Sequence, residues 1–206
     1  MNILAVDSTG EGLTLAVGDG VSTPISVESS TRRQDEELQP LLAKVLKKAR
    51  LKLGELDAVA AACGPGRFTG IRVGMTFAGM LARCIGRPAL AVSHFEAAAA
   101  REGRGRFYVD FRDRRGDHFI QVFRTGPRGA APAAAPFWTP GSRLRDELAR
   151  LAKSGGRMPG YRFDRLGFGA VALLPPARVK LDSKDFGEFH PLYLKPAHYE
   201  RPKHGR

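Results

Sequence analysis

Cysteine and long hydrophobic runs are scarce in this sequence, and both shortages exclude classes of protein. Cys63 and Cys84 are the only cysteines among 206 residues, too few for a zinc ribbon or a disulfide framework. No apolar run approaches the roughly 20 residues that a membrane-spanning helix needs. Residues 1–8 have the pattern of a strand and lack the basic start and small-residue cleavage site of a signal peptide. We therefore expect a cytoplasmic protein with reduced thiols and no membrane contact.

Paired catalytic groups are equally scarce. The five histidines include no His-x-x-x-His or His-Glu-x-x-His pair, the spacings that put two metal ligands on one helical face. Ser8, Ser93 and Ser142 lack the setting of a nucleophile elbow. Cys63 ends an apolar run that favours a buried, structural thiol, and a cap or packing role is the more common interpretation for His94. The sequence therefore contains no complete catalytic set and no metal site.

The charge balance favours a negatively charged partner. Lysine and arginine number 33 against 21 acidic residues, a net charge of +12, which attracts polyanions such as nucleic acid or an acidic protein. The alternative is an ordinary solvated surface, because the basic residues are spread along the whole chain. In the C-terminal tail, aromatic and basic residues alternate in a pattern that suits a weak contact with tRNA: Tyr193, Lys195, His198, Tyr199, Arg201 and Lys203.

The first half of the chain predicts a mixed sheet with helices. Residues 2–8, 12–18 and 21–29 are strand-like and mostly antiparallel, with Asp19-Gly20 as a hairpin turn. The period then changes to a helical stripe that consists of Leu38, Leu41, Leu42, Val45, Leu46 and Ala49. Pro40 places the regular start of this helix close to itself. A strand at 56–62, a helix at 69–82, a strand at 89–93 and a short helix at 94–100 follow, which implies crossover connections.

The second half is less regular. A basic, glycine-rich stretch near residue 104 marks a boundary, so we expect one lobe at residues 1–104 and a shortened lobe with a basic tail at 105–206. Residues 107–111 and 118–123 predict a hairpin, and the Pro/Ala-rich stretch 126–140 predicts an irregular connection. A helix is expected at 142–153. The remaining residues have weak periodicity.

Two loops carry the candidate binding residues. Asp7, Ser8 and Thr9 follow the first strand, where an acidic side chain holds a metal or its waters in nucleotide-handling folds; the alternative is a turn-forming aspartate. The second loop lies between a strand and a helix and contributes Gly64, Gly66, Arg67, Thr69 and Gly70. Its glycines permit unusual backbone angles beside Pro65, and Thr69 is a candidate helix cap. The loop matches neither the Walker pattern nor the dinucleotide fingerprint.

The string GPGRFTGIRVG at 64–74, with residues 2–17, 31–82 and 87–97 around it, closely resembles the TsaB (YeaZ) family. These bacterial proteins of the ASKHA superfamily take part in making threonylcarbamoyl-adenosine in tRNA. The resemblance covers roughly the first half, and residues 109–123 and 191–196 match more loosely. Arg67 stands where the family commonly has serine, and Asp35 where histidine is common. Arg67 would either strengthen anion binding or fill the loop.

The resemblance implies an actin-like, RNase H-like α/β fold of two lobes, in which helices flank mixed sheets. It implies a non-catalytic scaffold without a required cofactor, although a nucleotide with magnesium stays an open alternative. The implied partners are a TsaD-type catalytic subunit and a TsaE-type ATPase, while TsaC-type enzymes supply the intermediate. A homodimer through the same helices is a further implied state. Older naming gives this family a glycoprotease label, but the sequence contains no set of protease residues.

The family's partner contacts lie on the helices that correspond to residues 34–51 and 69–82. The candidate exposed apolar residues on them are Leu42, Val45, Met75 and Met80, although these side chains would also suit a face that covers the sheet. Two other functions stay open on the sequence alone. One is an enzyme, a nucleotide hydrolase that uses Asp7 with residues 64–70 or a peptidase; the other is a tRNA-binding module driven by the net charge.

Overall fold

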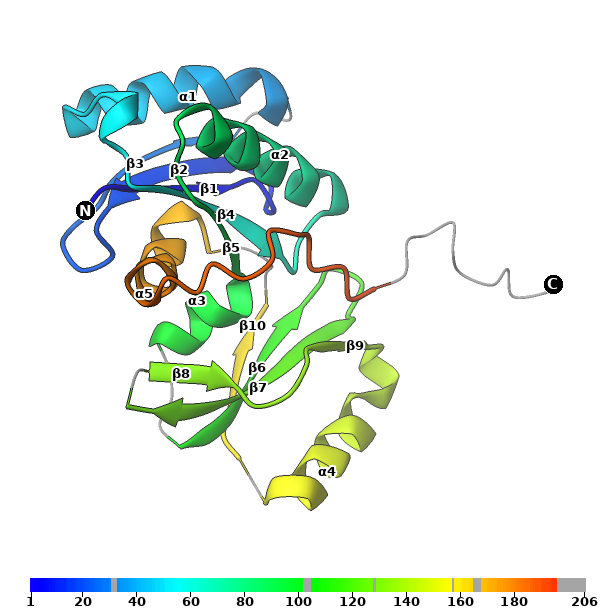
Figure 1. Cartoon of the computed structure of the whole chain (residues 1–206). Coiled ribbons are helices and arrows are strands. Elements are labelled where there is room, and N and C mark those ends of the chain that lie inside the picture. The colour runs from blue at the N-terminus through cyan, green and yellow to red at the C-terminus, as the bar shows by residue number, and fades with distance from the viewer. Residues whose placement is uncertain (31–32, 102–104, 128, 157, 165–167, 196–206) are drawn as a thin grey trace.

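The computed structural model describes residues 1–30, 33–101, 105–127, 129–156, 158–164 and 168–195. It contains two β-sheets, one above the other in Figure 1, with helices on their faces. The predicted lobe boundary after residue 104 and the tail from residue 196 lie outside the described residues. None of the described helices combines the length and the apolar character that crossing a membrane requires.

The first sheet has five strands in the order β3-β2-β1-β4-β5. They are β1 (Ile3–Asp7), β2 (Leu13–Gly18), β3 (Ile25–Ser29), β4 (Ala58–Gly64) and β5 (Ala89–Ser93). β1 pairs antiparallel with β2, and β2 with β3. β4 pairs parallel with both β1 and β5. The mixed sheet predicted from a meander and two crossover helices is therefore confirmed.

Alternation along β1 explains how both faces of this sheet are covered. Leu4 and Val6 lie in the core that the sheet shares with α1 (Gln34–Ala49) and α2 (Phe68–Cys84). Ile3 and Ala5 point to the opposite face, where the cover consists of η3 (Ala170–Leu173) and α5 (Leu174–Ser183). Successive side chains of a strand point to opposite faces. Figure 1 shows α1 and α2 above the sheet, with α5 and α3 (His94–Arg101) below it.

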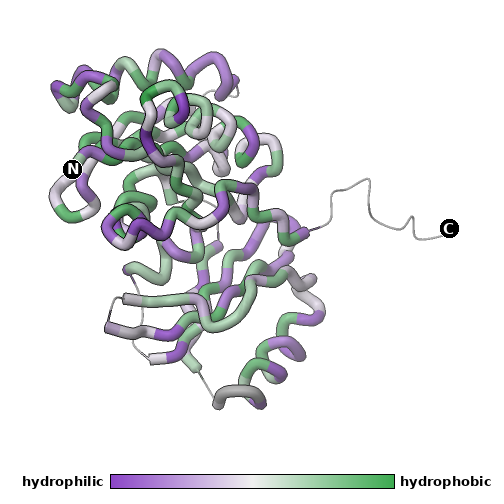
Figure 2. Tube along the Cα trace, viewed as in Figure 1, coloured by the Kyte–Doolittle hydropathy of each residue, from purple (hydrophilic) through white to green (hydrophobic). Residues whose placement is uncertain are grey.

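The predicted stripe of α1 faces the core. Leu38, Leu41 and Val45 are buried, and hydrophilic positions alternate with them along the helix (Figure 2). The helix begins at Gln34, earlier than the predicted start close to Pro40. Pro40 removes only one hydrogen bond, to the carbonyl of Glu36. The first turn carries three acidic residues, which interact favourably with the helix dipole and support the earlier start.

The second sheet is also mixed and has the order β10-β6-β7-β8, with β9 paired to β7. Its strands are β6 (Arg106–Arg112), β7 (His118–Gly126), β8 (Gly129–Pro132), β9 (Phe137–Thr139) and β10 (Gly160–Phe163). The hairpin of β6 and β7 was predicted. The irregular connection predicted at 126–140 is wrong in part, because β8 and β9 pair there with β7. η2 (Gly141–Arg143) leads into α4 (Leu144–Gly155), and η1 (Leu53–Glu55) precedes β4.

The second sheet has an aromatic core on one face and a buried ion cluster on the other. Phe107, Phe111 and Phe123 are fully buried beside α3. Asp110 points the opposite way because it alternates with them. Its carboxylate accepts a hydrogen bond from His118 Nδ1 at 2.8 Å and one from Arg162 Nε at 2.9 Å. This buried carboxylate therefore joins β6, β7 and β10.

The end of the described chain runs back across the molecule. We call residues 188–195 the C-terminal strap. Leu192 N–H donates to the Cys63 carbonyl at 2.8 Å, and Phe189 packs against the core under α2. Lys195 Nζ binds the carboxylates of Asp113 and Asp117 in the β6–β7 turn. The strap thus connects β4 of the first sheet to the hairpin of the second.

Candidate functional site

Asp7, Ser8 and Thr9 lie together at the carboxyl end of β1, and all three are buried. One oxygen of Asp7, Oδ1, accepts the Thr9 backbone N–H at 2.9 Å and the Thr9 hydroxyl at 2.6 Å. This is the local turn that aspartate forms when it binds the backbone two residues ahead. The interpretation of Asp7 as a turn-forming residue therefore accounts for one of its two carboxylate oxygens, Oδ1.

The other oxygen of Asp7 contacts residues that are distant in sequence. Oδ2 accepts the backbone N–H of Gly169 at 2.9 Å, and His94 Nε2 lies 3.6 Å from it. His94 is fully buried at the start of α3. Sequence reasoning treated His94 as a cap or packing residue and missed Gly169 altogether. No spacing in the sequence connects residue 7 with residue 169.

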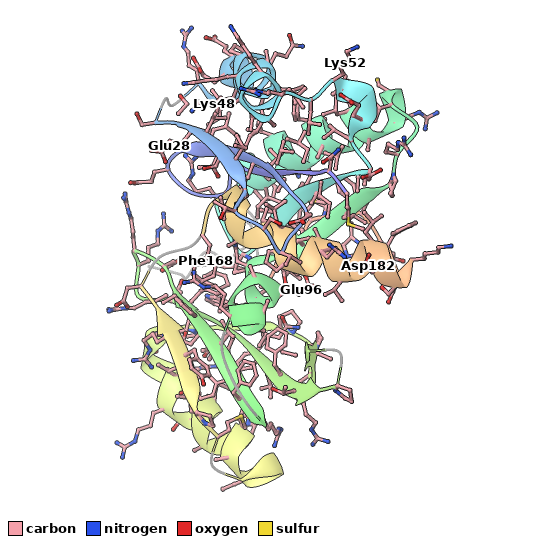
Figure 3. All side chains as sticks on the ribbon, turned by 90° about the vertical axis from the view of Figure 1, so that its left-hand side faces the viewer. Glu28, Lys48, Lys52, Glu96, Phe168 and Asp182 are labelled. Carbon is pink, nitrogen blue, oxygen red and sulfur yellow. The ribbon has the colours of Figure 1, made fainter. Side chains whose placement is uncertain are left out.

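The hydrogen bonds fix where the protons lie in this cluster. Because the Thr9 hydroxyl donates to Asp7, its oxygen accepts the contact with His94 Nε2 at 2.7 Å, so Nε2 carries a proton. The other ring nitrogen, Nδ1, is buried with no hydrogen-bond partner among the described residues. The His94 ring meets the edges of Phe111 and Phe168 at centroid distances of 6.4 and 6.0 Å. Phe168 lies where the two parts of the molecule meet (Figure 3).

The environment makes Asp7 a strong acid. Burial alone would raise the pKa of its carboxyl, but His94 and the hydrogen bonds from Thr9 lower it to about 2. Asp7 is therefore ionised at neutral pH. Its charge is stabilised by hydrogen bonds from Thr9 and Gly169, and such bonds offset the desolvation cost of a buried carboxylate.

The glycine-rich loop packs directly on Ser8 and Thr9. Arg67 N–H donates to the Thr9 carbonyl at 2.9 Å, and the Ser8 hydroxyl donates to the Gly70 carbonyl at 2.7 Å. A Cβ on Gly66 would lie 2.4 Å from Thr9 Cβ, and a Cβ on Gly70 would lie only 2.0 Å from the backbone carbonyl oxygen of Ser8. The space in front of these glycines is therefore filled by the end of β1.

Backbone angles explain only one glycine of the loop. Gly64 has φ +125°, and the Leu192 carbonyl of the strap lies 3.0 Å from the position of its missing Cβ. Gly66 does not have a positive φ, contrary to the expected reason for it. It is required because Thr9 is close.

The start of α2 corrects the predicted cap. The helix begins at Phe68, and Arg67 occupies the N-cap position without a side-chain capping bond. The prediction of Thr69 as the cap is therefore wrong; Thr69 lies in the first turn. Both Arg67 and Thr69 are exposed. Arg67 does not fill the loop with its side chain, since Thr9 does that.

Asp7 is only 3% exposed, and both of its oxygens accept hydrogen bonds from the chain, so a magnesium ion would reach this carboxylate only if groups of the chain moved. The described residues contain no group of three or more His, Cys, Asp or Glu that would hold a metal ion by themselves. Asp7, Ser8, Thr9, Gly66 and Gly70 lie together in a packed junction of chain segments, and Gly64 lies against the strap.

The predicted partner residues divide into three groups. Val45 and Met75 are buried, with exposed fractions of 0% and 4%, so the expectation that they are exposed is wrong. They face the sheet between α1 and α2, as the other interpretation of the stripe proposed. Leu42 is half-buried against the same core. Met80 has 64% of its surface exposed on α2 and alone remains a strong candidate.

The single buried thiol behaves as expected. Cys63 lies at the end of β4 and is 7% exposed. Burial, with a smaller effect of Glu96, raises its pKa to about 12. The thiol is therefore protonated and unreactive at neutral pH.

Sequence comparison finds relatives over part of the chain. Residues 25–106 match the family model described as TsaD, tRNA N6-adenosine threonylcarbamoyltransferase. A tRNA N6-adenosine threonylcarbamoyltransferase of Gluconobacter oxydans is 38% identical over 97 residues, which are 46% of this chain and 27% of that protein. An uncharacterized protein of Mycobacterium leprae is 32% identical over 136 residues, 64% of this chain and 38% of that protein. The matches thus span between 27% and 38% of these two relatives.

Comparison of folds extends the likeness to nearly the whole chain. YeaZ from Pseudomonas aeruginosa matches with a TM-score of 0.71 and 23% identity, over 94% of this chain and 100% of that one. A second Pseudomonas aeruginosa protein, described as uncharacterized with similarity to peptidase YEAZ, gives 0.73 and 23% over 94% and 99%. The predicted α/β fold, with two mixed sheets flanked by helices, is therefore confirmed. The stated resemblance to the TsaB (YeaZ) family is confirmed with it: the chain has the YeaZ fold, and residues 25–106 match the TsaD sequence family.

Proposed function

We propose that this chain is a non-catalytic subunit that supports formation of the threonylcarbamoyl group on tRNA adenosine. In this proposal a TsaD-type subunit performs the transfer, and a TsaE-type ATPase joins the assembly. The match of residues 25–106 to the TsaD family supports the pathway.

One observation carries the non-catalytic part of the proposal. The Asp7 carboxylate accepts from Thr9 with one oxygen and from Gly169 with the other. A carboxylate that binds a metal or activates water needs an oxygen that the metal or the water can reach, and Asp7 is only 3% exposed. Here Thr9 and Ser8 also occupy the space in front of Gly66 and Gly70. The junction therefore supports a structural role, in which the glycine-rich loop anchors the start of α2.

Helix α2 is the proposed docking element. Its inner face is held by Ile71, Met75 and Ala78 in the core, while Met80 projects with 64% of its surface exposed. An exposed methionine adapts to varied partners. We expect the TsaD-type partner to cover Met80 together with the adjacent surface of α1.

The test is complex formation with the TsaD-type protein of the same organism, measured by calorimetry and size-exclusion chromatography. Met80→Arg places a charge in the proposed interface and should weaken binding at least tenfold, about 1.4 kcal/mol. Val179→Arg is the matched control, because Val179 is 53% exposed on α5; it should bind like the wild type. An unaffected complex in Met80→Arg would place the partner elsewhere.

Activity assays decide between the subunit and the enzyme. The chain alone is mixed with ATP or GDP and magnesium, and phosphate release is measured for wild type and Asp7→Ala. We expect no turnover in either. Turnover that Asp7→Ala abolishes would refute the non-catalytic part of the proposal. Unchanged tRNA modification in cells depleted of this chain would refute its role in that modification.

A further inference from the structure

Phe68, Arg72 and Tyr193 form a cluster on the surface, which we call the Arg72 cluster. The Arg72 guanidinium lies 3.9 Å from the centre of the Phe68 ring and 5.9 Å from that of Tyr193. Its Nε donates to the Tyr193 hydroxyl at 3.0 Å. The two rings are 4.7 Å apart and tilted by 31°. A helix and the strap, 121 positions apart, thus hold two aromatic rings around one cation.

Both rings keep accessible surface. Phe68 is 38% exposed and Tyr193 is 43% exposed, so both rings can be reached from solvent beside the Arg72 guanidinium. The strap is held in place by other contacts, so the Arg72 cluster is not needed to attach it. Leu192 already binds Cys63, Phe189 packs in the core and Lys195 binds two carboxylates.

Positive charge surrounds the cluster. Arg67, exposed, directly precedes Phe68. Two residues beyond Tyr193, Lys195 binds the β6–β7 turn, which carries the exposed Arg115. The acidic groups of this region are engaged: Asp113 and Asp117 with Lys195, and Glu11 with Arg114. Against these three carboxylates stand five cations, Arg67, Arg72, Arg114, Arg115 and Lys195, so the named groups carry a net charge of +2, on a chain with a net charge of +12.

We propose that the Arg72 cluster binds single-stranded RNA. A base stacks on the exposed rings of Phe68 and Tyr193, and phosphates on either side of it pair with Arg67, Arg72 and Arg115. Aromatic side chains within a basic surface are how proteins hold single strands without sequence preference. An acidic peptide would use the charges but leave the rings unused. The inference goes beyond the proposed function, since a subunit that meets only proteins has no need of this surface.

The test measures fluorescence anisotropy of a labelled oligouridylate of about 12 nucleotides, with the full chain and no partner protein. Phe68→Leu and Tyr193→Leu keep apolar packing but remove the aromatic face, and each should raise Kd about tenfold. Tyr193→Phe keeps the ring and should stay within about threefold of wild type. Arg72→Gln should raise Kd and reduce the slope of log K against log salt by about one.

Matched controls separate this site from general attraction to charge. Phe186→Leu changes another exposed ring, and Arg83→Gln changes another exposed arginine of α2. Both variants should keep the stacking of the base, and the Kd of Phe186→Leu should equal that of the wild type. Thermal unfolding confirms that each variant is folded. The inference is overturned if the leucine variants bind like wild type, if Arg83→Gln weakens binding as much as Arg72→Gln, or if duplex RNA loses affinity equally in the leucine variants. Because the partner is absent from the assay, failure leaves the proposed function untouched.

Discussion

Gly70 and Gly66 determine how closely α2 approaches the end of β1. The position of a Cβ on Gly70 lies 2.0 Å from the Ser8 carbonyl oxygen, and that on Gly66 lies 2.4 Å from Thr9 Cβ. Real Cβ atoms do not approach other atoms to such distances, so any side chain there forces the backbone apart. These glycines thus allow two backbone segments to touch. Within the loop, only Gly64 has a backbone angle that other residues rarely adopt.

Gly70→Ala should therefore destabilise the protein by at least about 2 kcal/mol, because the backbone of Ser8 has to move. Gly54→Ala is the matched control, since nothing lies within 4 Å of the position of its Cβ. Its effect should stay within about 0.5 kcal/mol. Urea unfolding of both variants measures the difference. Equal stability of the two would mean that α2 does not lie this close to β1.

Sequence reasoning found part of this junction. Asp7 and the glycine-rich loop were recognisable because acidic and glycine residues followed strand-like runs. His94 was noted at a strand end, yet its contact with Thr9 depends on the parallel pairing of β4 with β1 and β5, which no spacing reveals. Gly169 contributes only a backbone N–H, and a backbone donor has no signature in a sequence.

At the scale of elements, the first sheet depends on the end of the chain. η3 and α5 cover its lower face with four residues that are at most 2% exposed: Ala170, Leu173, Leu174 and Ala177. They belong to the half of the sequence that the predicted boundary assigns to the second lobe. Without them, Ile3, Ala5 and Leu90 would face water.

A fragment of residues 1–101 should consequently lack a cooperative thermal transition, because the lower face of its sheet keeps only α3 as a cover. Joining residues 168–195 to it through a flexible Gly/Ser linker should restore the transition. The same fusion with Leu173→Asp and Leu174→Asp is the control and should not. Circular dichroism during heating reads the result. Cooperative unfolding of residues 1–101 alone would show that the first lobe is self-sufficient.

The elements that were predicted correctly have strong local patterns. The stripe of α1 follows from helical apolar spacing, and β1, β4 and β5 follow from short apolar runs. η3 and α5 were missed because residues 170–174 form a continuous apolar run and two prolines follow it, so no helical spacing is apparent. The strap has no regular structure, and contacts with distant residues fix its course. The helical stripe also misled: it marks Val45 as apolar but does not tell whether a partner or the sheet covers it.

At the scale of the whole molecule, Asp7 joins three distant segments. Its carboxylate contacts Thr9 after β1, His94 at the start of α3 and Gly169 ahead of η3. These segments come from the beginning, middle and end of the chain. Protonation of this one group should therefore loosen the packing of both parts together.

The direction of the pH effect follows from the pKa of Asp7, which falls from 3.8 to about 2 on folding. Because the unfolded chain takes up the proton first, the carboxylate stabilises the fold above about pH 4, and this stability is lost as the pH falls toward 2. The loss amounts to about 2 kcal/mol. Asp7→Asn should be less stable than wild type at pH 6, since its amide N–H₂ would face the Gly169 N–H.

The stability difference between wild type and Asp7→Asn should thus narrow by about 2 kcal/mol between pH 5 and pH 2, because only the wild type loses this charge. Denaturant unfolding at several pH values measures it. Glu28→Gln removes one exposed carboxylate of β3 (Figure 3) and controls for the change in net charge; its difference from wild type should change far less. A constant difference between wild type and Asp7→Asn would mean that the junction does not depend on the ionised carboxylate. The filled glycine loop would then have to be explained by packing of Ser8 and Thr9 alone.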